Sequence, residues 1–345
     1  MAYKISDKAI LVESGGENIL IAETATFKRG GLTLLDSDFT LSPTFVTNYF
    51  RAFQGVTSGY ASGGNITGPA KQNIIDKFSF SIDGNASDVG DLTRSIANIA
   101  SQSSDANGYT SGGGTPFFGT NVIDKFPFAT DDDASDVGDL TQARGYLTGQ
   151  SSTTHGYTSG GYYDFKNTID KFPFSVDANA SDVGDLTRSV FSLAGQSSQT
   201  HGYSSGGRVP PNNYSNIIDK FPFSTDANAS DVGDLTQSKE SVTGQNSSEN
   251  GYASGGLTNP SSTNLNVIEK FSFSSDGNGS DVGDLTEARQ GPSGQSSVTH
   301  GYTSGGYDGS SQVNTIDKFT FPSNANATDV GDLSVARYSS AGQQV

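Results

Sequence analysis

The chain has 345 residues, and its 37 acidic side chains outnumber its 20 lysines and arginines, which gives a formal net charge of -17. This charge repels phosphate backbones and anionic lipids and therefore argues against nucleic-acid and membrane-surface binding. Cysteine is absent, which excludes disulfides and thiolate chemistry, and no long apolar run suggests membrane insertion, so we expect a soluble protein.

The first segment, residues 1–45, precedes a series of repeats. Residues 8–23 form two apolar runs around Gly15 and Gly16, a pattern that predicts a β-hairpin, and a further strand is expected within residues 31–39. An isolated hairpin is only marginally stable in water. We therefore expect this segment to pair with another subunit, as in a homo-oligomer, to bind another protein, or to pack on the rest of the chain, and we interpret it as an attachment segment.

One cassette then recurs six times between residues 46 and 345. It consists of Gly-Tyr-x-Ser-Gly-Gly, a variable stretch, Asn-x-Ile-Asp-Lys-Phe-x-Phe in most copies, and an Asp-Val-Gly-Asp-Leu segment. The cassette starts at Gly59, Gly108, Gly156, Gly202, Gly251 and Gly301. A fixed period of this length indicates an array of small structural units rather than ordinary globular domains.

Each repeat contains short β-branched and aromatic runs separated by turn residues. In one repeat these runs predict strand a at residues 189–197, strand b at 203–207, strand c at 216–223 and strand d at 232–236, with His201 in the a–b turn. Four antiparallel strands in each of six repeats predict an all-β fold, a six-bladed β-propeller. We expect the paired phenylalanines of strand c to pack between blades, and Pro127, Pro173 and Pro222 to lie at a bulge or a strand end.

The two faces of such a ring differ in sequence. The a–b and c–d turns, which emerge on one face, are nearly the same in all repeats; we call this the uniform face. The b–c loops and d–a connections emerge on the other, which we call the variable face. Its b–c loops read NITGPAKQ, GTPFFGT, YYDFK, RVPPNNYS, LTNPSSTNL and YDGSSQV.

The variable loops are rich in Tyr, Asn, Gly and Ser, a composition typical of binding loops, in which aromatic side chains supply contact area at low entropic cost. The candidate ligand-binding residues are Phe117, Phe118, Tyr162, Tyr163, Phe165, Arg208, Tyr214 and Tyr307. The alternative is that these loops vary because nothing constrains them.

One c–d turn on the uniform face has the spacing of an Asp-rich calcium loop, in which alternate residues offer oxygen ligands. The candidate metal ligands are Asp177, Asn179, Ser181 and Asp185. Asp182 stands where such loops prefer glycine, and no bidentate glutamate follows. The alternative is an Asx-type turn that caps the hairpin. Calcium is the only cofactor that the sequence suggests.

No residues suggest a catalytic site. His155, His201 and His300 occupy matching turn positions of different repeats, too far apart on a ring to share one metal, and a role in the turns is expected. We find no Ser-His-Asp arrangement and no phosphate-binding glycine loop, and we therefore expect no enzymatic activity, although carboxylates in a central channel stay an open alternative.

The order of motifs resembles the Kelch family of propellers. The shared signals are a cation after strand d, a double glycine that ends strand b and an aromatic residue in strand c, whereas the Kelch tryptophan is missing. The cations are Arg94, Arg144, Arg188, Lys239, Arg289 and Arg337. The phrases IDKFPF, SDVGDLT and GQSSxTHGYTSGG are similar to repeat proteins of marine bacteriophages, including cyanophages, that are assigned as virion structural proteins.

This second resemblance implies a location in a virion, as a tail appendage or a component of the capsid surface. Residues 1–45 would then bind other virion proteins, and the variable face would bind a host surface glycan or a neighbouring virion protein. The alternatives are a polysaccharide-modifying propeller enzyme and a purely architectural spacer.

Two segments compete for the innermost strand of the first blade. Residues 335–345 contain the Ala-Gly-Gln sequence of the other a strands, whereas residues 49–55 lack the Gly-Gln pair. We favour the C-terminal segment, because pairing the two ends of the repeat region removes an open strand edge.

Overall fold

The computed structural model describes residues 54–66, 70–114 and 118–345, together with the backbone of four short strands near the N-terminus. The chain forms two compact units, Met1–Arg51 and Ala52–Val345. The boundary predicted after residue 45 lies outside the described residues. In the part of the chain that the structure covers, no helix is long and apolar enough to cross a membrane.

The N-terminal unit contains two strand pairs. β1 (Ile10–Ser14) and β2 (Glu17–Ile21) are antiparallel, with Ser14 opposite Glu17, as the predicted hairpin requires. β3 (Phe27–Arg29) pairs with β4 (Leu32–Leu34). β4 lies within the range in which a further strand was expected, and β3 was not predicted.

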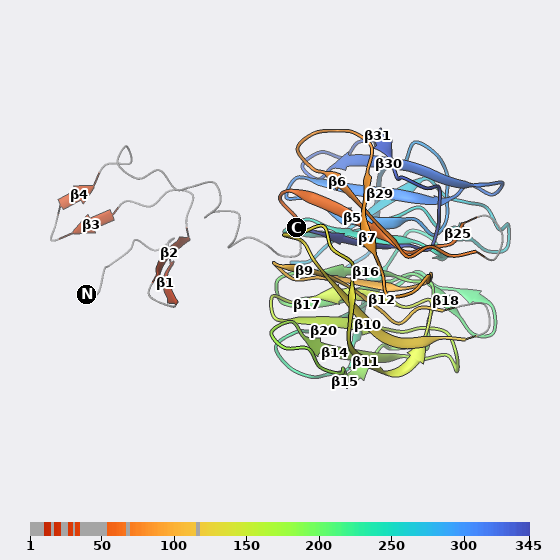
Figure 1. Cartoon of the computed structure of the whole chain (residues 1–345), viewed down its shortest axis with the longest axis horizontal. Helices are drawn as coiled ribbons and strands as arrows, with labels where there is room; N and C mark the ends of the chain where they lie inside the picture. The colour runs from red at the N-terminus through yellow and green to blue at the C-terminus, as the bar shows by residue number, and fades with distance from the viewer. Residues whose placement is uncertain are drawn as a thin grey trace. The chain divides into compact units, whose positions relative to one another are not determined.

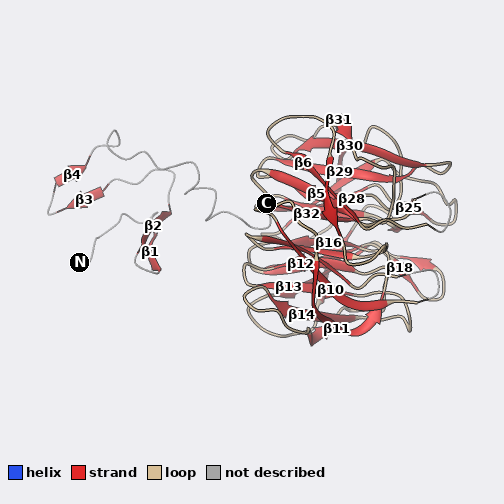
Figure 2. Ribbon diagram, in the orientation of Figure 1, coloured by secondary structure: helices blue, strands red, loops and turns tan. Residues whose placement is uncertain are grey.

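The second unit is a six-bladed β-propeller, as the repeats predicted, and its described residues form strands and loops without helices (Figures 1 and 2). From the axis outward, blade 1 consists of β32 (Ala341–Gln344), β5 (Ser58–Ser62), β6 (Ile74–Ser79) and β7 (Ser87–Asp91). Blade 2 consists of β8 (Ala100–Ser103), β9 (Asn107–Ser111), β10 (Thr120–Pro127) and β11 (Ser135–Arg144). Blade 3 consists of β12 (Thr148–Ser151), β13 (His155–Ser159), β14 (Thr168–Pro173) and β15 (Ser181–Asp185).

Blade 4 consists of β16 (Ala194–Ser197), β17 (His201–Ser205), β20 (Ile217–Pro222) and β21 (Ser230–Asp234). Blade 5 consists of β23 (Thr243–Asn246), β24 (Asn250–Ser254), β26 (Val267–Ser272) and β27 (Ser280–Asp284). Blade 6 consists of β28 (Ser293–Ser296), β29 (His300–Tyr307), β30 (Gln312–Thr320) and β31 (Thr328–Asp332). Two short pairs lie outside the blades: β18 (Arg208–Val209) with β19 (Asn213–Tyr214), and β22 (Lys239–Glu240) with β25 (Leu257–Thr258).

The ring is closed by the C-terminal strand, as predicted. β32 pairs with β5, with Gly342 opposite Ala61 and Gln343 opposite Tyr60. The Nε2 of Gln343 then donates to the backbone oxygen of Tyr109 in blade 2 at 3.1 Å. The equivalent bonds from each inner strand to the next blade are Gln102 to Tyr157, Gln150 to Tyr203, Gln196 to Tyr252, Gln245 to Tyr302 and Gln295 to Tyr60.

The predicted strand limits need three corrections in blade 4. Strand a begins at Ala194 rather than Ser189, because Ser192 has a φ of 55° and the extended chain cannot pass through it. Strand d is β21, which begins and ends two residues earlier than predicted. Strand b is β17, which begins and ends two residues earlier than predicted, so that His201 is its first residue, not part of the turn, and pairs with Pro222. The three prolines end their strands, as expected.

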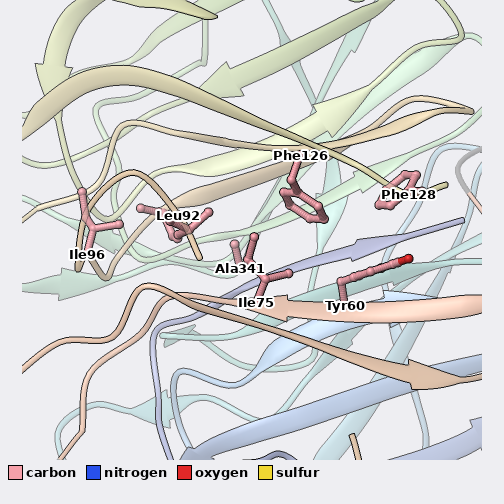
Figure 3. Close-up of a cluster of buried hydrophobic side chains, with 8 residues drawn as sticks. Tyr60, Ile75, Leu92, Ile96, Phe126, Phe128 and Ala341 are labelled. Atoms are coloured by element: carbon pink, nitrogen blue, oxygen red, sulfur yellow. The ribbon is translucent and has the colours of Figure 1, made fainter. Parts of the chain in front are cut away.

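Aromatic side chains form the contacts between neighbouring blades. Tyr60 of blade 1 lies against Phe126 and Phe128 of blade 2, with ring centroids 5.6 and 4.9 Å apart (Figure 3). The same arrangement joins Tyr109 to Phe172 and Phe174, Tyr157 to Phe221 and Phe223, Tyr203 to Phe271 and Phe273, Tyr252 to Phe319 and Phe321, and Tyr302 to Phe78 and Phe80. The predicted packing of the phenylalanine pairs between blades is therefore confirmed.

The inner strands approach one another closely at a repeated glycine. A Cβ on Gly244 would lie 2.0 Å from the backbone oxygen of Gly195 in the preceding blade, and one on Gly195 would lie 2.3 Å from that of Gly149. No side chain fits in this space. The glycine of the Gly-Gln pair is thus required by the narrow centre of the ring.

The cation that follows strand d forms an ion pair with the next blade. Arg144 and Asp170 are both fully buried, with 3.0 Å between Nη2 and Oδ2. Arg289 with Asp317 and Arg337 with Asp76 form equivalent buried pairs, and Arg188 with Asp219 and Arg94 with Asp124 form more exposed ones. In the corresponding pair between blades 4 and 5, Lys239 stands in place of the arginine and Glu269 in place of the aspartate. These cations therefore have a structural role.

Candidate ligand-binding face

On the uniform face, the residues of the c–d turn contact the preceding blade. Asp177 accepts a hydrogen bond from the Nζ of Lys125 at 2.5 Å, and Asn179 accepts one from the backbone nitrogen of Asp139 at 3.0 Å. Ser181 begins β15 and Asp185 ends it. The backbone nitrogen of Asp185 in turn donates to Asn228 of the next blade at 3.1 Å.

These contacts recur around the ring. In every interface the backbone nitrogen of the aspartate before the leucine of the Asp-Val-Gly-Asp-Leu segment donates to a turn side chain of the next blade. The pairs are Asp91 to Asp133, Asp139 to Asn179, Asp185 to Asn228, Asp234 to Asn278, Asp284 to Asn326 and Asp332 to Asn85. Such contacts support the interpretation as structural turns. Within the described ranges, no three acidic or histidine side chains gather as metal ligands; calcium binding at the four candidate residues stays a prediction.

The histidines also belong to this face. The Nδ1 of His155 lies 2.8 Å from the hydroxyl of Thr154, and His201 and His300 make the same contact with Thr200 and Thr299. Burial lowers the pKa of each histidine, and a nearby lysine lowers it further. The three residues lie at equivalent positions of blades 3, 4 and 6 and form no common site.

The backbone of the variable face is regular at its centre. One residue in each d–a connection has a φ between 53° and 61°, in the left-handed region. Its nitrogen donates to the oxygen of the equivalent residue in the preceding blade, over 2.6–2.9 Å, and the six bonds form a closed ring. The members are Asn98, Tyr146, Ser192, Ser241, Gly291 and Ser339. They border a cavity of about 110 Å³ at the mouth of the central channel.

A second regular contact lies just outside this ring. In every blade the residue after the double glycine forms a bridge with the residue that precedes the left-handed position. The pairs are Asn65 with Tyr338, Gly114 with Ala97, Tyr162 with Gly145, Arg208 with Phe191, Leu257 with Glu240 and Tyr307 with Gln290. The backbone at these positions is therefore repeated while the side chains differ in almost every copy.

The repeated backbone and the differing side chains together distinguish between the two interpretations of the variable loops. Loops that vary without constraint would be expected to lose regular backbone contacts along with their sequence. Here the inner parts of the loops keep their backbone hydrogen bonds in all six blades. A rigid scaffold that carries changing side chains is the usual construction of a binding surface.

The side chains form a pocket of about 350 Å³ over blades 3 and 4. Its lining residues come from two b–c loops and three d–a connections: Tyr146, Tyr162, Tyr163, Phe165, Phe191, Ser192, Arg208, Pro211, Asn212, Glu240 and Ser241. Four of the predicted ligand-binding residues, Tyr162, Tyr163, Phe165 and Arg208, are brought together here. Figure 1 shows β18 and β25 at the edge of the propeller opposite the C-terminus, on this face.

Aromatic rings make up one side of the pocket. The ring of Tyr162 lies 5.4 Å from that of Phe165 and 5.0 Å from that of Phe191, between centroids. Tyr163, Asp164 and Phe165 all have positive φ values, between 49° and 76°, a conformation that costs energy in residues other than glycine and is often found at functional sites. Tyr162 and Phe165 are still 36% and 41% exposed.

Arg208 and Glu240 make up the polar side. The guanidinium of Arg208 lies between the rings of Phe191 and Tyr214, 5.9 and 5.8 Å from their centroids. Its Nη1 is 3.5 Å from Oε1 of Glu240, and its Nη2 donates to Oδ1 of Asn212 at 2.6 Å. Burial raises the pKa of Glu240, and Tyr214 and Arg208 partly oppose this. Burial, with a hydrogen bond to Glu240, raises the pKa of Tyr214 to about 12.

The other predicted residues lie elsewhere or outside the described chain. Tyr214 contacts the pocket through Arg208 and does not line it. Phe118 is 77% exposed on the b–c loop of blade 2. Tyr307 is in blade 6, where its ring lies 5.8 Å from that of Tyr338. Phe117 lies outside the described residues.

Sequence reasoning missed Tyr146, Phe191 and Glu240, which come from the d–a connections. A signal was present for Phe191 and Glu240, which occupy one position at which all six repeats differ, whereas the position of Tyr146 is serine in three of the repeats. These residues were not predicted to bind a ligand because the d–a connection was interpreted as the start of strand a, whose side chains would face other blades.

Comparison with known proteins adds no family: no protein-family model matches the chain, and no curated protein matches its sequence.

Proposed function

We propose that the protein is a virion structural protein, a tail appendage or a component of the capsid surface, whose propeller presents its variable face to a host glycan or to a neighbouring virion protein. The location in a virion is inferred from the phrases shared with phage repeat proteins. The binding role is inferred from one observation: a repeated backbone brings diversified aromatic and polar side chains into a single pocket.

The position at which the chain enters the propeller supports a binding role for the variable face. The Nε2 of Gln54 donates to the backbone oxygens of Ser297 and Asn246, at the inner ends of blades 6 and 5 on the uniform face. The backbone nitrogen of Gly55 donates to the oxygen of Ser296 beside them. The connection to residues 1–45, our proposed attachment segment, therefore starts on the face opposite the pocket.

The pocket favours binding over catalysis. Enzymes that hydrolyse glycosidic bonds generally use two carboxyl groups. Among the described residues that line the pocket, Glu240 is the only carboxylate. A polysaccharide-modifying enzyme is thus the weaker alternative, and detectable turnover of a polysaccharide would support it.

Two experiments test the proposal. Mass spectrometry of purified particles should detect the chain in the virion, and its absence from particles would contradict the proposed location. A glycan array probed with the full-length protein should give specific signals that decrease in the variant Tyr162→Ala/Phe165→Ala. An array without any signal would leave the architectural spacer as the better account.

A further inference from the structure

The size of the pocket indicates what kind of ligand it accepts. Its volume of about 350 Å³ falls within the range of small-molecule sites, ~300–1,000 Å³. A protein partner would bury roughly 800 Å² on each side, over a wider and flatter area. The pocket therefore fits a small molecule or one unit of a longer chain.

The aromatic side offers apolar surface that is already ordered. Contacts among Tyr162, Phe165 and Phe191 hold the rings together, and Tyr146 extends the cluster, with its ring centroid 6.1 Å from that of Tyr162. Ordered rings lose little conformational entropy on binding. The C–H face of a pyranose ring is an apolar surface of the shape that stacks on such side chains.

The polar side has no net charge. Among the described lining residues, Arg208 and Glu240 are the charged ones, and they pair with each other. An anionic sugar would compete with Glu240 for the guanidinium, and a cation would approach a site that already contains Arg208. Hydroxyl groups, which both donate and accept, can bind the two side chains without separating them.

One donor in this arrangement is unused. The Nε of Arg208 is buried and has no hydrogen-bond partner within the described part of the chain, an unfavourable state for a buried donor. The Nε atoms of Arg144, Arg188, Arg289 and Arg337 are unpaired in the same way, so this donor does not by itself indicate a ligand.

We propose that this pocket binds one pyranose unit of an uncharged glycan, with its C–H face on the rings of Tyr162, Phe165 and Phe191 and its hydroxyls on Arg208 and Glu240. This inference rests on the proposed glycan-binding function and specifies its ligand class. The ligand unit is selected by the neutral Arg–Glu pair as much as by the aromatic rings.

The test is a titration of the full-length protein with four probes by calorimetry and saturation-transfer NMR: methyl glucoside, methyl galactoside, glucuronic acid and choline. A neutral glycoside should bind saturably and more tightly than the acid. Phe165→Ala should weaken this binding by about tenfold or more, as loss of a central aromatic contact does. Glu240→Gln, which preserves the shape of the buried side chain, should also weaken it.

The control variant is Ile82→Ala, which removes an exposed apolar side chain, 73% accessible, from the uniform face. Its affinity should equal that of the unmodified protein. Phe165 is exposed, so its replacement leaves the fold intact, which circular dichroism would check.

Other outcomes would overturn the inference. Tighter binding of glucuronic acid, lost in Arg208→Gln, would identify an acidic-sugar site. Binding of choline that is lost in Phe165→Ala and kept in Arg208→Gln would identify an aromatic cage for cations. Array signals that persist in both Phe165→Ala and Glu240→Gln would contradict this site but leave glycan binding intact, whereas an array with no signal would contradict glycan binding by the propeller.

Discussion

The ion pair at the interface of blades 4 and 5 shows how single residues are matched across the ring. Lys239 and Glu269 replace the Arg–Asp pair of the other interfaces, and both are fully buried with 3.6 Å between the charged atoms. The longer glutamate compensates for the shorter reach of lysine. Two exchanges at positions 30 residues apart in the chain thus preserve one contact.

We expect Glu269→Asp to lower the free energy of unfolding by about 1–3 kcal/mol, because the shorter carboxylate leaves the buried Lys239 without a partner. Adding Lys239→Arg should recover most of this loss by recreating the pair of the other blades. Urea denaturation of the two single variants and the double variant measures the coupling. Additive losses would show that the two residues do not depend on each other.

The inner glycine gives a second test. Gly244→Ala places a methyl group against the oxygen of Gly195 and should cost about 1–3 kcal/mol of stability, in the range of overpacked cores. Gly84→Ala is the matched control, since no atom lies within 4 Å of its added Cβ, and it should change stability by less than ~0.5 kcal/mol. Equal effects would mean that the centre of the ring is less tightly packed than described.

The histidines of the uniform face predict a pH dependence. Because burial lowers their pKa values, the unfolded chain binds protons more tightly than the folded one. Stability should be unaffected above the ordinary histidine pKa of about 6.5 and should fall as the pH drops below it. A variant with His155→Gln, His201→Gln and His300→Gln should lose less stability between about pH 7.5 and about pH 5. An equal loss in both proteins would assign the effect to other groups.

Among the elements, β32 matters most to the ring. It is the inner strand of blade 1, and Val345 accepts backbone hydrogen bonds from residues 56–58. Its identity could be predicted from the sequence because its Ala-Gly-Gln matches the other inner strands. The residue at which each inner strand starts could not be predicted from the sequence. A residue with positive φ ends the extended chain in each d–a connection, and serine or tyrosine at that position gives no local signal of such a turn.

Deletion of residues 339–345 should destabilise the propeller by several kcal/mol and promote aggregation, because it leaves the edge of β5 unpaired. Thermal unfolding and light scattering measure both effects. A chain that has the same seven residues moved to the position directly before Gln54 restores the strand as a regular hairpin and should be stable. Aggregation of this permuted chain as well would show that pairing of the edge is not the cause.

At the scale of the whole molecule, the repeats predicted the blade number, the two faces and the packing of the phenylalanine pairs. The lining of the candidate pocket was predicted in part. The sequence indicated Tyr162, Tyr163, Phe165 and Arg208 as binding residues, but their meeting with Phe191 and Glu240 depends on the closed ring of backbone bonds that places three connections beside two loops. Contacts between residues of different repeats cannot be predicted from the local sequence.

The proposed function requires that the variable face over blades 3 and 4 binds the ligand and that the uniform face does not. Hydrogen exchange measured by mass spectrometry, with and without a glycan identified on the array, tests it most directly. We expect slower exchange in peptides that cover residues 157–168 and 203–217, and unchanged exchange in the c–d turns. Protection confined to the c–d turns, with none around the pocket, would contradict it.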